Sequence, residues 1–240
     1  MTNMLKGFAL AVSMLSIIPF FKVHDFNKGI NGYAVMFYPV VGFMLGTILY
    51  LSYLLISTSF SSSHVGIIIF ALLVVLSGAL HLDGLSDTID GFFVDKTEAL
   101  EVMKDSHVGG MGMTFTAVFL ILKASSLAVF SAFYLLPIVL MLSRFNAVLA
   151  IYLSPYISKN GMGTLAKKEL KAWQVGVAFI FVAVLSFSSI WLLAISIAVL
   201  ITCGYLFIKR YGGFSGDIYG FTIEVTELIL LNSILLGIGL

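Results

Sequence analysis

Seven of the twelve acidic residues lie between Asp83 and Asp105, directly after a stretch that is apolar enough to cross a bilayer. If this segment is helical, Asp83, Asp87 and Asp90 share one face, because they follow i, i+4, i+7 spacing. Like charges stacked in this way repel one another unless a cation lies among them. Carboxylates without cysteine favour Mg²⁺, or Mn²⁺, over zinc. We therefore expect a divalent metal here; the alternative is the solvated face of a loop helix.

A second acidic group lies near the C-terminus. The glycine-rich run 212–220 contains Asp217 and leads into an apolar span that carries Glu224 and Glu227 one turn apart. Glycine-rich backbone can approach a phosphate closely and point N–H groups at it. Charged residues within a span are costly and usually functional. Asp217 and the two glutamates are thus candidates for holding metal or orienting an attacking hydroxyl.

The composition indicates the environment in which these acids work. Of the 240 residues, 60% are hydrophobic and 10% are charged, which is typical of an integral membrane protein rather than a soluble domain. The net charge is +1 and no run is rich in Lys or Arg, so nucleic acid is not an expected partner. Cys203 is the single cysteine, which excludes an internal disulfide.

Hydropathy predicts an all-α, polytopic membrane bundle that forms one domain over residues 1–240. We expect about seven transmembrane helices, near residues 32–56, 65–80, 111–131, 136–153, 173–185, 189–208 and 218–240. A turn is expected at Ser186–Ser189. Residues 4–21 are expected to form a re-entrant or interfacial helix that Pro19 closes, rather than a cleaved signal peptide, because no cleavage site follows.

The charged residues sort to one side of these spans. Segments on that side hold nearly all of them, namely 22–31, 83–110, 154–172 and 209–217. The opposite loops, around 57–63, 132–135 and 186–189, contain no Asp, Glu, Lys or Arg. The positive-inside rule makes the charged side cytoplasmic. We therefore expect an active site that faces the cytoplasm from the cytoplasmic (inner) membrane.

Three motifs carry a resemblance to a known family. The run His81 to Phe92 resembles the HLDGLADTADGLF signature of cobalamin synthase, the adenosylcobinamide-GDP ribazoletransferase family. The run Met103 to Gly109 is similar to the family's MRDSRIG element, although Lys104 and His107 replace its arginines. The run Gly212 to Glu227 resembles GGxTGDxxGAxxExxE, and Phe8 to Pro19 is similar to the family's opening helix. The family's Ala-Arg pair is missing from the loop Tyr156 to Thr164.

The resemblance implies a reaction. The family joins adenosylcobinamide-GDP to α-ribazole or its 5′-phosphate, and releases GMP. The ribose 3′-hydroxyl attacks the phosphorus on the aminopropanol arm, so positioning and charge neutralisation are the main requirements. Mg²⁺, or alternatively Mn²⁺, is expected to supply the charge neutralisation. The expected metal ligands are Asp83, Asp87, Asp90 and Asp217, and the expected catalytic set adds Glu224 and Glu227. The expected substrate-binding residues are His81, Glu101, Lys104, Asp105, Ser106, Lys123, Arg144, Gly213 and Gly216.

Two other functions fit parts of the pattern. A CDP-alcohol phosphotransferase-like lipid enzyme also holds Mg²⁺ with aspartates at a membrane edge, but its DGxxAR arrangement is absent after Asp90–Gly91. An ion-coupled transporter would use Lys123, Arg144 and the acids as an ion path, with inverted repeats and charges near the midplane. The expected partners are the two substrates and the lipid bilayer, with a homo-oligomer or a complex with other corrinoid enzymes as further options.

Overall fold

The computed structural model describes residues 2–18, 29–105, 107–158 and 162–237. These residues form α-helices, two short 3₁₀ helices and a single β-bridge, with no strand among them, so the all-α expectation is confirmed. The helices are α1 (Asn3–Leu15), α2 (Asn31–Met36), α3 (Tyr38–Ile56), α4 (Ser62–Ser77), α5 (Leu80–Phe92), α6 (Ala99–Val102), α7 (Gly110–Ala128), α8 (Leu136–Leu153), α9 (Met162–Glu169), α10 (Ala172–Leu185), α11 (Ile190–Tyr211) and α12 (Gly216–Leu235).

Five of the described helices are long and apolar enough to cross a membrane. They are α3, α7, α8 with the 3₁₀ turn before it, α11 with its own 3₁₀ turn, and α12. A sixth span results if α4 and α5 are taken together as one bent element. The expected number, about seven, is not confirmed, because α10 is apolar but has only 14 residues. The predicted turn before α11 is present as the 3₁₀ helix Phe187–Ser189.

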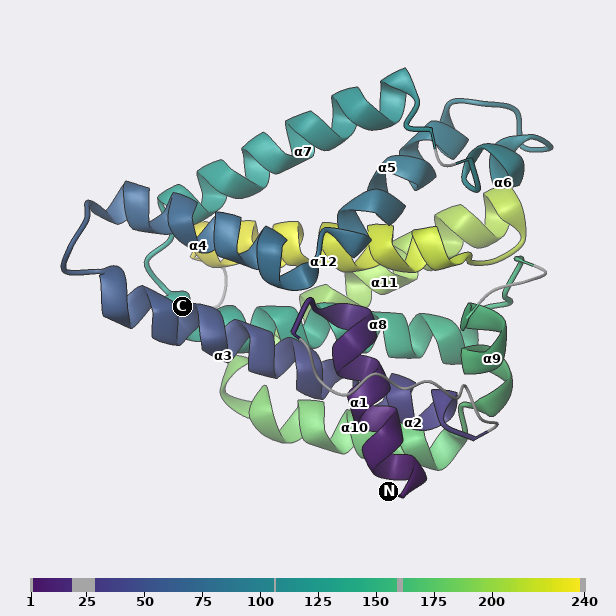
Figure 1. Cartoon of the computed structure of the whole chain (residues 1–240), viewed down its shortest axis with the longest axis horizontal. Helices are drawn as coiled ribbons and strands as arrows, with labels where there is room; N and C mark the ends of the chain where they lie inside the picture. The colour runs from purple at the N-terminus through teal and green to yellow at the C-terminus, as the bar shows by residue number, and fades with distance from the viewer. Residues whose placement is uncertain (1, 19–28, 106, 159–161, 238–240) are drawn as a thin grey trace.

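Helix α8 is the centre of the bundle. It is buried along most of its length and packs against α3, α10, α11 and α12 (Figure 1). Its inward residues Leu140 and Phe145 are fully buried, as are Leu45 and Leu49 of α3. Buried side chains of this size stabilise the bundle through close packing, because lipid tails are as apolar as leucine and give helices no hydrophobic reason to associate.

A sharp bend separates α4 from α5. The two helix axes meet at 85°, and the two residues between them, Gly78 and Ala79, have φ angles of +64° and +54°. Glycine adopts this left-handed conformation without steric cost, whereas Ala79 is strained there. The bend turns α5 out of line with α4 and lays it across α12. The sequence predicted a span at 65–80 followed by a polar segment. In the structure the start of that polar segment belongs to α5, which packs against α12.

Helix α1 is short and crosses the bundle near α2 and α3 (Figure 1). Its 13 residues begin after Thr2, whose hydroxyl caps Leu5 N–H at 3.5 Å, and it is shorter than the roughly 20 residues of a perpendicular crossing. The Ile17 N–H donates to the Leu76 carbonyl at 2.9 Å, which ties its end to α4. Pro19, expected to close this helix, lies outside the described residues.

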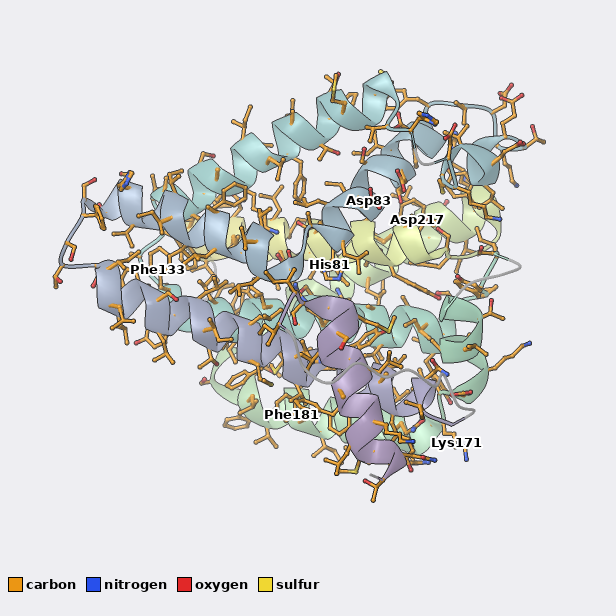
Figure 2. The ribbon with its side chains drawn as sticks, in the orientation of Figure 1. His81, Asp83, Phe133, Lys171, Phe181 and Asp217 are labelled. Carbon is orange, nitrogen blue, oxygen red and sulfur yellow. The ribbon has the colours of Figure 1, made fainter. Side chains whose placement is uncertain are left out.

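The connections divide between the two ends of the bundle. Figure 1 shows α6, α9 and the α11–α12 turn at the right-hand end, and the α3–α4 and α7–α8 connections at the left. Figure 2 places Asp83 and Asp217 close together toward the right and Phe133 far to the left. Both acidic motifs therefore lie toward the end that carries the charged connections.

Candidate active site

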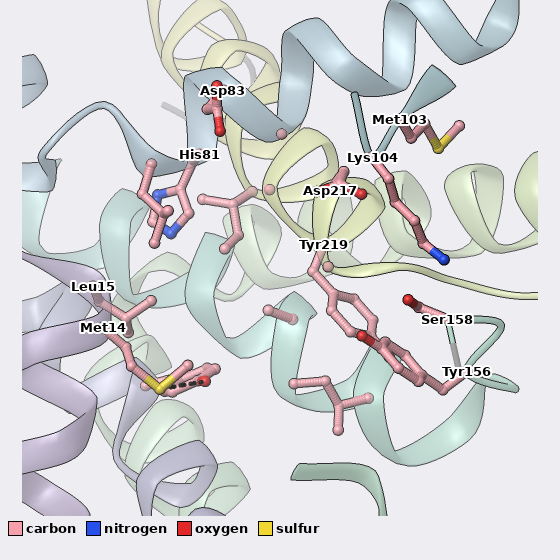
Figure 3. Close-up of a pocket in the computed structure, with 18 residues that line it drawn as sticks. Met14, Leu15, His81, Asp83, Met103, Lys104, Tyr156, Ser158, Asp217 and Tyr219 are labelled. Carbon is pink, nitrogen blue, oxygen red and sulfur yellow. Dashed lines mark hydrogen bonds between the residues drawn. The ribbon is translucent and has the colours of Figure 1, made fainter. Parts of the chain in front are cut away.

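A cavity of about 440 Å³ opens where α1, α5, α8 and α12 meet (Figure 3). This volume is in the range of sites that hold small molecules. Met14, Leu15, Ala147, Ile151 and Ile223 are apolar residues of its lining. The lining also includes the tyrosines Tyr38, Tyr156 and Tyr219, and the polar residues His81, Asp83, Lys104, Ser158 and Asp217.

Asp83 and Asp217 share this cavity because α5 and α12 pack closely. A Cβ atom added at Gly84 would lie only 2.8 Å from the Asp217 carbonyl oxygen and 3.0 Å from its Cα, so a glycine is needed at this crossing. Gly220 of α12 lies against the His81 backbone in the same crossing. The prediction that the two acidic motifs meet is thus confirmed for Asp83 and Asp217.

The start of α12 presents Asp217 to the cavity. The Ser215 hydroxyl accepts a hydrogen bond from Ile218 N–H at 3.3 Å and donates one to Asp217 Oδ2 at 3.1 Å. Gly216, one of the predicted phosphate-binding glycines, lines the cavity in this first turn. A helix N-terminus with open backbone N–H groups favours a bound anion. Gly213 is buried instead against the carbonyl oxygen of Pro155 and does not line the cavity.

Asp87 lies at the centre of the negative charge. It is half-buried, and the charges of Asp83, Asp217 and Asp90 all act on it. Lys104, which lines the cavity, is a cation that acts on Asp217. Among the residues that the structure describes, no three carboxylate, imidazole or thiol side chains are already gathered around a common point. The metal site at Asp83, Asp87 and Asp217 stays a prediction.

Asp90 makes different contacts from the other two aspartates of α5. It is buried, and its Oδ2 and Oδ1 accept hydrogen bonds from the N–H groups of Gly109 and Gly112, at 2.8 Å and 2.7 Å. These bonds hold the first turn of α7 against α5, because they satisfy N–H groups that have no partner within the helix. Its role as a metal ligand stays a prediction.

Glu224 and Glu227 belong to a buried ion cluster between α7, α8 and α12. Lys123 Nζ lies 2.6 Å from Glu224 Oε2 and 2.5 Å from Glu227 Oε2, and Arg144 Nη1 pairs with Glu227 Oε1. The Ser143 hydroxyl donates to the same Glu227 oxygen at 3.2 Å. The four charged side chains are at most 4% exposed, so no wet cavity surrounds them.

The cluster contains two cations and two anions and is therefore neutral overall. This pairing makes it tolerable to bury four charged groups within a membrane bundle. The sequence suggested that Lys123 and Arg144 contact pyrophosphate or balance acids. The structure shows that they balance the acids of α12, and neither of them lines the cavity.

The remaining predicted residues lie at the rim or outside. Glu101 and Asp105 are exposed and border a shallow depression together with Lys104. The backbone N–H of His107 donates to Asp105 Oδ1 at 3.0 Å, and the ring Nδ1 of His107 lies 2.7 Å from the same oxygen. These hydrogen bonds lower the pKa of the Asp105 carboxyl. Ser106 lies outside the described residues.

Sequence reasoning missed the three tyrosines that line the cavity, Tyr38, Tyr156 and Tyr219. Tyr156 follows α8, and Tyr219 lies within the glycine-rich motif, one turn into α12. Burial raises the pKa of the Tyr156 phenol, and the nearby charge of Asp217 acts in the same direction. The position of Tyr219, two residues after Asp217, was the one feature of the sequence that could have indicated a tyrosine in the site.

The chain is similar to known proteins along nearly its whole length. The family model described as cobalamin-5-phosphate synthase matches residues 7–235. The adenosylcobinamide-GDP ribazoletransferase of Acinetobacter baumannii (strain ACICU) is 34% identical over 236 residues, which cover 93% of this chain and 94% of the relative. The enzyme of the same name from Desulforamulus reducens is 34% identical and covers 98% of each chain. That from Carboxydothermus hydrogenoformans is 32% identical and covers 97% of each.

No solved structure matches this chain. The family match includes every residue that lines the cavity, from Met14 to Ile223, and the curated relatives match nearly from end to end. Their shared name denotes an enzyme, which confirms the resemblance carried by the three motifs. The chain therefore belongs to the cobalamin-5-phosphate synthase family of ribazoletransferases.

Proposed function

We propose that this chain joins adenosylcobinamide-GDP to α-ribazole, or to its 5′-phosphate, and releases GMP. The product is adenosylcobalamin or its phosphate. The observation that carries the proposal is the shared cavity of Asp83 and Asp217, which brings two acidic motifs from distant parts of the chain to one small-molecule site. The names of the relatives support the same reaction.

The cavity residues fit a bound Mg²⁺. Asp83 and Asp217 of the cavity, and Asp87, on which both of them act, offer only carboxylate oxygens, which are the ligands of a hard divalent cation. Positive charge relieves their mutual repulsion. Mg²⁺ bound there would neutralise charge on the diphosphate during transfer. Mn²⁺ meets the same ligand requirement.

The chain's own groups then position the diphosphate. The first turn of α12 presents backbone N–H groups at Gly216, and Lys104 adds a cation near Asp217. Both favour an anion at the mouth of the cavity. Because a phosphoanhydride is already activated, holding it in line with the ribose 3′-hydroxyl supplies much of the rate.

The proposed placement is the cytoplasmic membrane, with the cavity facing the cytoplasm. Support comes from the long apolar helices and from the charged connections that gather at the same end as Asp83 and Asp217 (Figures 1 and 2). Substrates made in the cytoplasm would reach the cavity from that side. A homo-oligomer or an assembly with other corrinoid enzymes is compatible with this placement.

The test is GMP release by the purified protein in detergent. With Mg²⁺, release should require both adenosylcobinamide-GDP and α-ribazole, and EDTA should abolish it. Asp83→Asn should lower the rate by roughly 100-fold or more, since a metal contributes several kcal/mol of charge stabilisation. The matched control Glu98→Gln alters an exposed acid that does not line the cavity and should leave the rate unchanged. CMP release from a CDP-alcohol, without GMP release, would contradict the proposal.

A further inference from the structure

Two tyrosine rings lie side by side on the cavity wall away from Met14 and Leu15 (Figure 3). The Tyr156 and Tyr219 ring centroids are 6.1 Å apart and the ring planes differ by 15°. Nearly parallel rings at this separation are offset, so neither covers the whole face of the other. Phe214 stacks on Tyr219 with centroids 5.6 Å apart, which makes Tyr219 the middle ring of three.

The backbone holds this pair in register. Ile157 N–H donates to the Phe214 carbonyl, and Phe214 N–H donates to the Pro155 carbonyl, both at 2.9 Å. This bridge ties the segment that carries Tyr156 to the turn that begins α12. Gly163 of α9 packs directly on the Tyr156 ring, because a Cβ atom at Gly163 would lie 2.5 Å from its carbon atoms. Tyr156 is therefore fixed from two directions.

Polar groups beside the rings have no partner within the described structure. The Tyr219 hydroxyl and both ring nitrogens of His81 are buried and make no hydrogen bond there. Tyr219 is 7% exposed and His81 is 4% exposed, and both line the cavity. A phenylalanine would fill the position of Tyr219 without an unpaired hydroxyl, so packing alone does not explain this residue. Because both residues line the cavity, a molecule bound there is the candidate for the missing hydrogen-bond partner.

We infer that Tyr156 and Tyr219 form the subsite for the flat base of the nucleoside acceptor, with the Tyr219 hydroxyl and His81 as hydrogen-bonding groups. This inference rests on the proposed function, which requires a ribonucleoside beside the diphosphate. The base of α-ribazole, a methylated benzimidazole, is planar and largely apolar. Planar bases of this kind stack on aromatic side chains.

The rest of the cavity favours this base over guanine. Met14 and Leu15, on the side away from the tyrosines, are apolar, and guanine would leave several edge donors and acceptors unpaired against them (Figure 3). A corrin ring is several times larger than a nucleoside and does not fit within about 440 Å³. The cavity thus suits the nucleoside, and the corrinoid would remain outside with its diphosphate arm reaching Asp83 and Asp217.

The experiment measures binding of α-ribazole alone, and of GDP alone, by titration calorimetry with the detergent-purified protein. Tyr156→Leu and Tyr219→Leu should each raise the Kd for α-ribazole roughly 10-fold or more, since a base stacks less well on leucine. Tyr219→Phe keeps the ring and should cause a smaller loss. The Kd for GDP should not change. Tyr134→Leu, which removes an exposed ring that does not line the cavity, is the control.

An unchanged Kd for α-ribazole in Tyr156→Leu and Tyr219→Leu overturns the inference, as does weakened binding of GDP instead. So does wild-type protein that binds no α-ribazole. If a leucine variant does not fold, the Kd of Tyr219→Phe for α-ribazole still tests the role of the Tyr219 hydroxyl. Release of GMP tests the proposed function separately: if wild type releases GMP while the tyrosine variants bind α-ribazole normally, the function stands and the subsite does not.

Discussion

Replacing Lys123 with methionine removes one cation from the buried cluster of α7, α8 and α12. Lys123 is the partner of Glu224 and one of two cationic partners of Glu227, which also pairs with Arg144. The variant therefore leaves Glu224 without a cation and gives the cluster a net negative charge. Methionine keeps most of the length of the lysine stem, so the change in packing is small.

The expected cost follows from burial. Removing one partner of a buried ion pair destabilises a protein by about 3–5 kcal/mol, because the other charge stays buried and uncompensated. Adding Glu224→Gln to Lys123→Met makes the cluster neutral again and leaves the Arg144–Glu227 pair intact. The double variant should therefore recover part of the loss, with a coupling of about 1–3 kcal/mol.

The assay is unfolding in mixed micelles, followed by circular dichroism, for wild type, both single variants and the double variant. Lys209→Met at the exposed end of α11 is the control and should change the free energy of unfolding by less than about 0.5 kcal/mol. If the effects of Lys123→Met and Glu224→Gln are additive, the two side chains do not interact, and the description of the cluster is wrong.

Three further predictions concern the elements that build the site. Gly84→Leu should destabilise the protein by about 1–3 kcal/mol and lower GMP release, because a side chain there meets the Asp217 backbone; wild-type stability would contradict the close crossing of α5 and α12. Ala79→Gly should raise the free energy of unfolding by about 1 kcal/mol or less, as left-handed strain at the bend is relieved; a lower unfolding midpoint would speak against that strain. Asp90→Ala should cost about 1–3 kcal/mol by leaving the N–H groups of Gly109 and Gly112 without their acceptor, and hydrogen exchange at the start of α7 should rise; unchanged exchange would refute this capping role.

Hydropathy and charge predicted much of the fold. Helices occur near every predicted span, and the turn before α11 falls at Ser186–Ser189, because runs of apolar residues and short polar breaks are local features of the sequence. The helical spacing of the α5 aspartates was also correct. The number of spans was harder to predict, since α10 is too short by itself to cross a bilayer of ordinary thickness.

Contacts between distant segments could not be predicted in the same way. The bend at Gly78–Ala79 lays α5 across α12. The sequence alone does not distinguish Gly84 from any other helix glycine, because its role depends on the close approach of the Asp217 backbone. The partners of Glu224 and Glu227 lie on two other helices, so the sequence indicated charged residues within spans but not their pairing. Tyr156 and Tyr219 stack although they are far apart in the sequence, and the backbone bridge between Tyr156 and Phe214 joins their segments.

A direct test of the central claim is Mn²⁺ binding, measured by electron paramagnetic resonance on the detergent-purified protein without substrates. If Asp83 and Asp217 serve one metal site, Asp83→Asn and Asp217→Asn should each weaken the same binding event, by roughly 10-fold or more, since a bound carboxylate is lost in both. Glu98→Gln should bind Mn²⁺ like wild type. Loss of Mn²⁺ affinity in one aspartate variant with wild-type affinity in the other would show that the two motifs do not hold a common ion.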